Sequence, residues 1–259
     1  MIVLIIGGDS LIGSALFEYW REDKTIQCYS STRNNHLVSD SRPYIDLKKP
    51  ELFKIDKHYE VVILCASISS IVSCNLNKKQ TRIINVDNTY SVSKKLSQLG
   101  AHIIFLSSNQ VFDGTVPFKK NNDSKSPISE YGKQKVDTEE LISGLKRFSI
   151  LRLTKVMHPE LSLLLKWKGI LENGEKISAF KDMYFSPIDI KKVIGKIDFL
   201  TKKKLVGIYH CSGCEDISYY DFAIKYVEEL GYSKELVKED FCKKKGIIPV
   251  RFTSLMSDC

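Results

Sequence analysis

The sequence contains no apolar run as long as a membrane-spanning helix, although 43% of its 259 residues are hydrophobic. The apolar opening at residues 1–6 is short, lacks a basic segment and leads directly into glycines. It therefore predicts a buried strand rather than a signal peptide. No other targeting signal is present, and we expect a soluble cytoplasmic protein that makes no membrane contact.

Clustered metal ligands are also missing. The seven cysteines are scattered, and the one pair with CxxC spacing, Cys211 and Cys214, has His210 beside it. A structural zinc site takes four ligands, usually from two such clusters, and no second cluster follows. We expect no metal and interpret residues 207–211 as a strand that enters a loop. A metal or redox role for this pair is the less favoured alternative.

The basic charge does not follow the pattern of a nucleic-acid-binding protein. The formal net charge is +8, but the lysines are spread along the chain without interleaved aromatic residues. Solvated helix faces explain this distribution better, so we expect no nucleic-acid partner. The surplus of positive charge favours phosphorylated ligands in general.

Apolar segments of strand length alternate with helical patterns along the chain. Strands are predicted at 2–6, 26–30, 61–66, 102–107 and 149–153, and helices at 11–21, 80–98 and 131–145. Such alternation predicts an α/β fold with a doubly wound parallel sheet of the Rossmann type.

Beyond about residue 155 the alternation loosens. Helices are predicted at 161–172, 189–200 and 219–230, with a strand at 205–211. We expect a large nucleotide-binding domain at 1–155 and a small C-terminal substrate-binding lobe at 156–259. Because no Gly/Ser-rich linker separates them, the two are expected to share one interface and to be interleaved.

The segment GGDSLIG at residues 7–13 joins the first strand to the first helix. A tight glycine turn lets the backbone approach a pyrophosphate, and the helix N-terminus offers free N–H groups and a favourable dipole. Serine replaces the glycine usual at the middle position, but it is small and can itself donate to phosphate. We expect a dinucleotide to contact Gly7, Ser10, Leu11, Ile12 and Gly13. An ordinary strand-to-helix turn is the alternative.

The end of the second predicted strand distinguishes between cofactors. NAD-binding enzymes usually place an acidic residue there, but this chain has Ser-Ser-Thr-Arg at residues 30–33. The planar guanidinium of Arg33 suits a ribose 2′-phosphate, and the hydroxyl of Thr32 can assist. The charge pattern therefore favours NADP(H) over NAD(H). The alternative is that Arg33 is a solvated loop residue.

A YxxxK pattern lies on the helix predicted at 131–145. Residues four apart share a helix face, so the ammonium of Lys135 is expected beside the phenol of Tyr131 and should lower its pKa. Tyr131 would then exchange a proton with a carbonyl or alcohol oxygen. Ser107 and Ser108 end the preceding strand, where ligands of such sheets bind, although serine is also a common turn residue.

Together, GGDSLIG, SSNQVFDG at 107–114 and YGKQK at 131–135 resemble the extended short-chain dehydrogenases/reductases, in particular the dTDP-4-dehydrorhamnose reductase (RmlD-like) branch. The resemblance implies a catalytic triad of Ser108, Tyr131 and Lys135, in which Tyr131 and Lys135 also contact the cofactor and Lys135 holds the nicotinamide ribose. It also implies cofactor contacts by Asp46, Leu47, Cys65, Ala66 and Ser67, and it extends to Asn85 and Arg152. Asn109 and Lys155 depart from the family pattern near the expected substrate, and with Asp182 they are the expected substrate contacts.

The resemblance implies NADPH-dependent reduction of a keto group on a nucleotide-activated sugar, as in polysaccharide biosynthesis. A nucleotide-sugar epimerase is an alternative, whereas a dehydratase usually needs an acidic pair where Asn109 and Gln110 stand. A third reading is a non-catalytic NADP-binding regulatory subunit, since the beta subunit of methionine adenosyltransferase has a similar fold and keeps YxxxK. The expected partners are the nucleotide sugar and, in a homodimer, a second copy of the chain.

Overall fold

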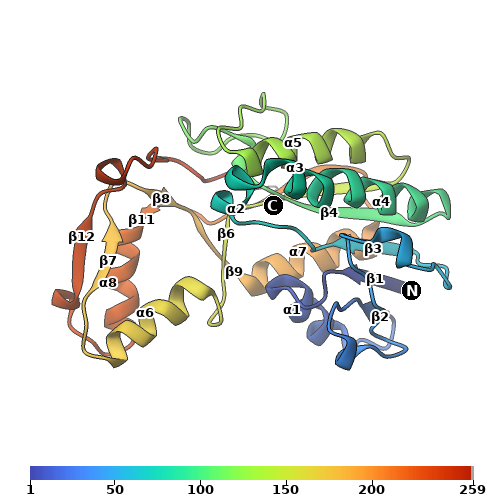
Figure 1. The fold of residues 1–259 in the computed structure, drawn as a ribbon, viewed down its shortest axis with the longest axis horizontal. Coiled ribbons are helices and arrows are strands. Elements are labelled where there is room, and N and C mark those ends of the chain that lie inside the picture. Colours follow the sequence, from blue (N-terminus) through green and yellow to red (C-terminus); the bar gives the residue numbers. More distant parts are fainter. Residues whose placement is uncertain (258–259) are drawn as a thin grey trace.

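The apolar strand segments form one six-stranded parallel sheet in the computed structural model, which describes residues 1–257. Its strand order is β10-β5-β4-β3-β1-β2 (Figure 1). The strands are β1 (Ile2–Ile6), β2 (Gln27–Ser30), β3 (Val61–Leu64), β4 (His102–Ser108), β5 (Phe148–Leu153) and β10 (Gly207–Cys211). All neighbouring pairs are parallel, so every carboxyl end meets the same edge of the sheet.

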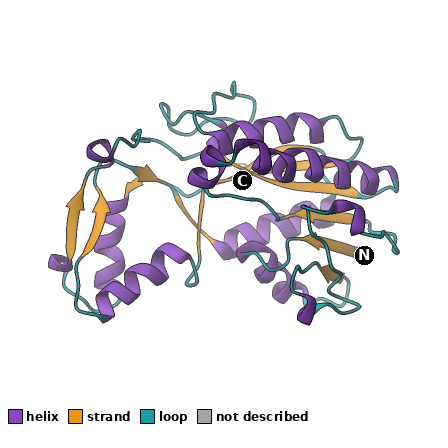
Figure 2. Cartoon of the chain, viewed as in Figure 1, coloured by secondary structure: helices purple, strands orange, loops and turns teal. Residues whose placement is uncertain are grey.

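Helices cover both faces of this sheet, as expected for strands that are apolar on both sides (Figure 2). Along β1, Val3 and Ile5 enter the core under α1 (Leu11–Trp20) and α7 (Ile190–Lys203). Leu4 and Ile6 face the opposite core. That core is covered by the chain of helices α2 (Ile71–Leu76), α3 (Lys78–Arg82), a π-helical segment (Ile83–Asn88), α4 (Thr89–Gln98) and α5 (Glu130–Ser143).

A smaller lobe lies beside the large sheet and has its own apolar core. Trp167 of α6 packs there with Ala223 and Val227 of α8. The lobe contains α6 (Ser162–Glu172), β7 (Ile177–Phe180), β8 (Tyr184–Phe185), β11 (Ile217–Ser218), α8 (Tyr219–Glu229) and β12 (Val237–Asp240). Two further strands, β6 (Lys155–Met157) and β9 (Pro187–Asp189), pair with each other and connect it to the large sheet.

The expected division at residue 155 does not coincide with the change from sheet to lobe. Both α7 and β10 lie beyond that residue, yet α7 packs on the large sheet and β10 is its edge strand beside β5. The chain therefore leaves the sheet after β5, builds part of the lobe, and returns to complete the sheet. The apolar face of α7 is buried against the large sheet, where its apolar residues pack in the core under β1.

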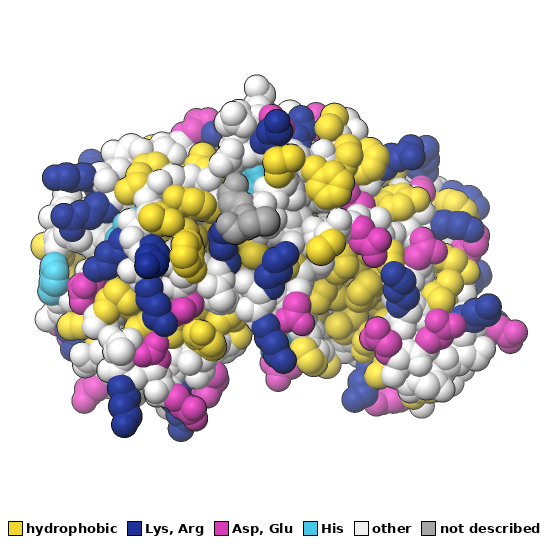
Figure 3. Space-filling view, turned by 180° about the vertical axis from the view of Figure 1, so that it is seen from behind, with side chains coloured by type: hydrophobic (Ala, Val, Ile, Leu, Met, Phe, Trp, Pro, Cys, Tyr) yellow, Lys and Arg dark blue, Asp and Glu magenta, His cyan; other side chains and the backbone are white. Residues whose placement is uncertain are grey.

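The predicted helices and strands of the large sheet all occur, with ends shifted by a few residues. The lobe differs more, because its strands of two to four residues are too short to produce a periodic pattern. Single 3-10 turns occur at Asn35–Leu37, Pro50–Leu52, Asn109–Val111, Lys234–Leu236 and Cys242–Lys245. On the face shown in Figure 3, basic side chains are dispersed among acidic ones, in keeping with solvated surfaces.

A buried ion pair joins α5 to β5. Arg152 donates to Glu139 through Nε (2.9 Å) and Nη2 (2.8 Å), and both side chains are 1% exposed. Ser107 of β4 donates to the same carboxylate at 2.5 Å, and Arg152 also reaches the carbonyl of Asn121 at 3.1 Å. The pair thereby fixes the carboxyl ends of β4 and β5 relative to the helix that carries the YxxxK residues.

We predict that Glu139→Ala strongly destabilises the protein, because it leaves the guanidinium of Arg152 buried without its counter-charge. Loss of one partner of a buried pair costs about 3–5 kcal/mol. Glu140→Ala is the matched control, because Glu140 is the next residue and its pair with Lys125 lies at the surface. Its cost should be below about 1 kcal/mol. Urea denaturation measures both free energies of unfolding, and equal losses would contradict the assigned role of the buried pair.

Candidate active site

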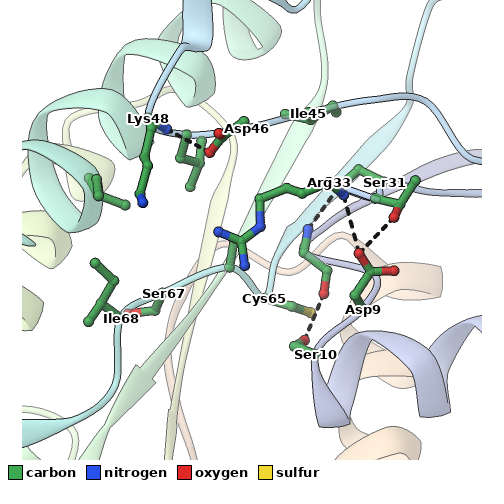
Figure 4. A pocket seen from close by; sticks show the side chains of 15 residues that line it. Asp9, Ser10, Ser31, Arg33, Ile45, Asp46, Lys48, Cys65, Ser67 and Ile68 are labelled. Carbon is green, nitrogen blue, oxygen red and sulfur yellow. Dashed lines mark hydrogen bonds between the residues drawn. The ribbon is translucent and has the colours of Figure 1, made fainter. Parts of the chain in front are cut away.

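A pocket lies at the carboxyl ends of β1, β2 and β3 (Figure 4). It is lined by Gly7, Asp9, Ser10, Ser31, Thr32, Arg33, Ile45, Asp46, Leu47, Lys48, Cys65, Ala66, Ser67, Ile68 and Ile84. Nine of the residues expected to contact a cofactor are among these: Gly7, Ser10, Thr32, Arg33, Asp46, Leu47, Cys65, Ala66 and Ser67. Segments far apart in the sequence meet here because parallel strands end at one edge.

The glycine loop brings backbone against backbone at the base of the pocket. Gly7 has a φ of +93°, and a Cβ on it would lie 2.5 Å from the amide nitrogen of Ala66. A Cβ on Gly13 would lie 2.3 Å from the carbonyl oxygen of Gly7. No other residue permits these approaches, so the glycines allow the loop and the start of α1 to close on the strand ends.

Ser10 stabilises the loop from within. Its hydroxyl donates to the carbonyl of Gly7 at 2.7 Å and accepts from the amide of Gly13 at 3.2 Å, which makes it the N-cap of α1. The serine thus replaces the usual glycine while supporting the same turn. Leu11 and Ile12 begin α1 and are half-buried. Neither they nor Gly13 line the pocket, so any contact that these residues make with a dinucleotide has to come from the N-terminal end of α1.

The end of β2 differs from the sequence-based expectation in one respect. Arg33 is exposed and its guanidinium extends into the pocket (Figure 4). However, the carboxylate of Asp9 also lies there, accepting from the hydroxyl of Thr32 at 2.7 Å and from the amide of Arg33 at 3.2 Å. The acid that is absent from the β2 sequence is therefore supplied by the glycine loop. Sequence reasoning missed it because only the fold brings residues 9 and 32 together.

The loop after β3 is held by Asn85 in the π-helical segment. Its side-chain oxygen accepts from the amide of Ile68 at 2.8 Å, and its nitrogen donates to the carbonyl of Ile68 at 3.0 Å. The same nitrogen donates to Gln134 of α5 at 2.8 Å. Asn85 thus fixes Cys65, Ala66 and Ser67 at the pocket wall relative to α5. π-helical segments are frequent at functional sites, but this one has no clear signal in the sequence.

The residues of the expected triad come together beside the pocket, at the end of β4 and the start of α5. Ser129 caps α5 by accepting from the amide of Gly132 at 3.0 Å. A Cβ on Gly132 would lie 2.2 Å from the carbonyl oxygen of Gln110, so this glycine lets the first turn of α5 approach the segment after β4. As a result, Tyr131 lies where Ser108 and Ser67 can act as its hydrogen-bonding partners.

The pKa of Tyr131 lies above its ordinary value, contrary to the expected lowering. Burial disfavours the phenolate and is the largest cause, while hydrogen bonds with Ser108 and Ser67 offset part of it. The ammonium of Lys135 lies 5.6 Å from the centroid of the Tyr131 ring and donates to the carbonyl of Leu106 at 2.8 Å. The pKa is raised because the phenol is buried, and the ammonium expected to lower it is directed to the backbone of β4.

Lys135 itself is buried, and this burial lowers its pKa to about 8, with Glu139 opposing part of the shift. At neutral pH the ammonium form therefore prevails. A second ring, that of Phe105, lies 4.5 Å from the ammonium. The arrangement provides a phenol that keeps its proton and a nearby cation held by a carbonyl and two aromatic rings.

The three expected substrate contacts have different environments. Asn109 follows Ser108 and accepts a hydrogen bond from its hydroxyl at 3.4 Å, so the Asn109 side chain lies beside the triad. Lys155 is half-buried in β6, with its ammonium 5.3 Å from the Tyr219 ring and 5.8 Å from the Phe185 ring. Asp182 accepts from the amide of Cys242 at 2.7 Å and from that of Lys243 at 3.2 Å. Its carboxylate thus caps a backbone turn of the lobe.

Residues 1–257 contain no group of three or more His, Cys, Asp or Glu side chains placed to hold a metal ion. Cys211 is buried and Cys214 exposed, and His210 lies 3.4 Å from Arg152. Within the same residues, none of the helices has the length and apolar character needed to cross a bilayer.

Comparisons with known proteins agree with this architecture. Residues 1–245 match the family model of the RmlD substrate binding domain. The beta subunit of methionine adenosyltransferase 2 from Bos taurus is 23% identical over 239 residues, covering 85% of this chain and 70% of the relative. The spore coat polysaccharide biosynthesis protein SpsK from Bacillus subtilis is 28% identical over 180 residues, covering 67% and 63%.

A similar solved structure is that of a dTDP-4-dehydrorhamnose reductase from Bacillus anthracis in complex with NADP. Its TM-score is 0.84 at 19% sequence identity, and the match covers 99% of this chain and 90% of that one. This likeness establishes the fold of the sheet and the lobe together.

We predict that Gly13→Val reduces NADPH affinity at least about tenfold, because the added side chain would force the start of α1 away from Gly7. Gly195→Val is the matched control, since Gly195 also lies in a helix but has open space around it. Titration of NADPH fluorescence measures both affinities, and circular dichroism checks that the variants fold. Unchanged affinity in folded Gly13→Val protein would disprove the assignment of the loop.

Proposed function

Since the chain belongs to the RmlD substrate binding domain family, we propose that it reduces a keto group on a nucleotide-activated sugar with NADP(H) as cofactor. The observation that carries this proposal is the meeting of Ser108, Tyr131 and Lys135 at the edge of a pocket formed by a glycine loop. The polysaccharide-biosynthesis relative and the reductase structure support the same class of substrate.

The residues of the pocket fit NADP(H). The glycine loop provides the close backbone approach that a pyrophosphate needs, since the positions of Gly7 and Gly13 leave no space for a side chain. Arg33 and Lys48 provide cations for a ribose 2′-phosphate. Ile45, Leu47 and Ile68 provide apolar walls for a base, and Asp46 provides a polar contact at its edge.

The chemistry that bound NADPH supplies is hydride transfer to the carbonyl carbon. The protein's own residues then handle the carbonyl oxygen. The hydroxyl of Ser108 donates a hydrogen bond that orients it, and Tyr131 donates the proton that converts it to an alcohol. At neutral pH the phenol is protonated, so Tyr131 can donate when hydride transfer builds negative charge on the carbonyl oxygen, although its raised pKa makes it a weaker acid than a free phenol. Lys135 stabilises the phenolate that forms, through its cation near the ring.

An epimerase would use the same triad but return the hydride to the same nucleotide sugar, so it would not consume NADPH. A second candidate function is favoured by a specific observation: the similarity to the beta subunit of methionine adenosyltransferase 2 covers 85% of this chain. A non-catalytic subunit would bind NADP(H) without turnover. Incubation with a panel of 4-keto nucleotide sugars, followed by NADPH absorbance, distinguishes the reductase from both alternatives. Oxidation of NADPH supports the reductase, and its absence with every substrate contradicts it.

We predict that Tyr131→Phe removes most reductase turnover, by about 10²–10⁴-fold, because the proton donor is lost while the ring remains. NADPH affinity and the free energy of unfolding should change little. Ser108→Ala should also lower the rate, and Lys135→Ala should weaken both rate and cofactor binding. Steady-state kinetics on the substrate identified above gives the rates. Full activity of Tyr131→Phe would refute the assigned proton donor.

We further predict that NADPH binds more tightly than NADH and that Arg33→Ala removes most of this difference. A charge-assisted hydrogen bond contributes about 1.5–3 kcal/mol, which corresponds to roughly tenfold or more in affinity. Lys49→Ala is the control, because Lys49 is an exposed lysine near the pocket but not among its lining residues. Fluorescence titration with both cofactors provides the dissociation constants. Equal constants in the unmodified protein would contradict the assigned preference.

A further inference from the structure

The carboxylate of Asp9 occupies the place in the fold from which an acidic residue selects NAD(H). In NAD-binding proteins of this type, an acid at the end of the second strand accepts hydrogen bonds from the ribose hydroxyls. Here the acid comes from the glycine loop, and its Oδ2 accepts from Thr32 and from the amide of Arg33, which stand two and three positions after the end of β2. The side chain lines the same pocket as the guanidinium of Arg33 (Figure 4).

A carboxylate at this position opposes the preference that Arg33 creates. It attracts the hydroxyl of an unmodified ribose and repels the charge of a 2′-phosphate, so both effects favour NAD(H). Arg33 acts in the other direction, because its guanidinium pairs with phosphate. The pocket thus contains one group that favours each cofactor, and the balance between them depends on how much of the Asp9 charge is already compensated.

Arg42 provides that compensation. Its Nη2 forms an ion pair with Oδ1 of Asp9, on the side of the carboxylate away from Thr32. Arg42 lines a hollow beside the glycine loop together with Gly8, Phe17 and Leu37, and its guanidinium carbon lies 5.9 Å from the centroid of the Phe17 ring. Arg42 is therefore fixed in place by packing as well as by charge.

We propose that the Asp9–Arg42 pair determines cofactor discrimination in this protein. Asp9 acts as the acid of the β2 end and limits the preference for NADP(H) to a modest ratio. Arg42 neutralises part of its charge and thereby prevents a reversal of the preference. This inference rests on the proposed binding of a nicotinamide dinucleotide in the pocket, and it adds that the preference for NADPH is the net result of two opposing charged groups.

The test measures the ratio of the NADH and NADPH dissociation constants by fluorescence titration of the full chain. Asp9→Asn keeps an oxygen that accepts from Thr32 but removes the charge, so the ratio should rise about fivefold in favour of NADPH. Arg42→Met keeps an unbranched side chain in the hollow and removes the guanidinium with its compensating charge, so the ratio should fall by a similar factor. Glu18→Gln is the control, because Glu18 lines the same hollow without contacting Thr32 or Arg33, and its ratio should not change.

Opposite shifts in the two variants support the proposal. An unchanged ratio in both, with both cofactors still bound, overturns it while leaving the proposed function intact. If Asp9→Asn does not fold, Arg42→Met decides alone, because a ratio that stays equal to that of the unmodified protein contradicts the compensation. Failure of the unmodified protein to bind either cofactor overturns the proposed function itself, and is therefore distinguishable from failure of the inference.

Discussion

The structure depends on close approach of helix N-termini to the carboxyl edge of the sheet. At Gly13 and Gly132 a single added carbon atom would lie 2.3 Å and 2.2 Å from a backbone carbonyl oxygen, so neither α1 nor α5 could keep its position with any other residue. The first approach forms the base of the pocket, and the second brings Tyr131 to the end of β4. Both parts of the candidate site therefore follow from the same steric condition, met at two strand–helix junctions.

Hydrogen bonds from buried polar side chains hold these junctions together. Asn85 connects the loop after β3 to Gln134 on α5, and Glu139 connects α5 to Arg152 on β5. Each of these groups has a partner for its charge or polar atoms, which is the condition under which burial is tolerated. Together they position one helix, α5, against three strands. The distance between the triad and the pocket wall is therefore set by residues that belong to neither of them.

Charge in the site is arranged by burial and by pairing rather than by simple proximity. Lys135 and Tyr131 are four residues apart on α5, yet the ammonium contacts the carbonyl of Leu106 and the phenol has a raised pKa. Asp9 and Arg33 line one pocket with opposite charges, and Arg42 binds the first of them. Burial keeps the Tyr131 phenol protonated, and the ion pair with Arg42 compensates part of the Asp9 charge.

The sequence by itself determined the α/β class, the strands and helices of the large sheet, the glycine loop and the YxxxK helix, because period and turn chemistry are local properties. It also identified most of the pocket residues, through the glycine loop, the end of the second strand and the resemblance to the dehydrogenase family. Only the tertiary structure decided that α7 and β10 return to the sheet, that Asp9 reaches the end of β2, and that Asp182 caps a turn in the lobe. Those outcomes depend on contacts between residues far apart in the chain, and neither periodicity nor motif spacing contains that information.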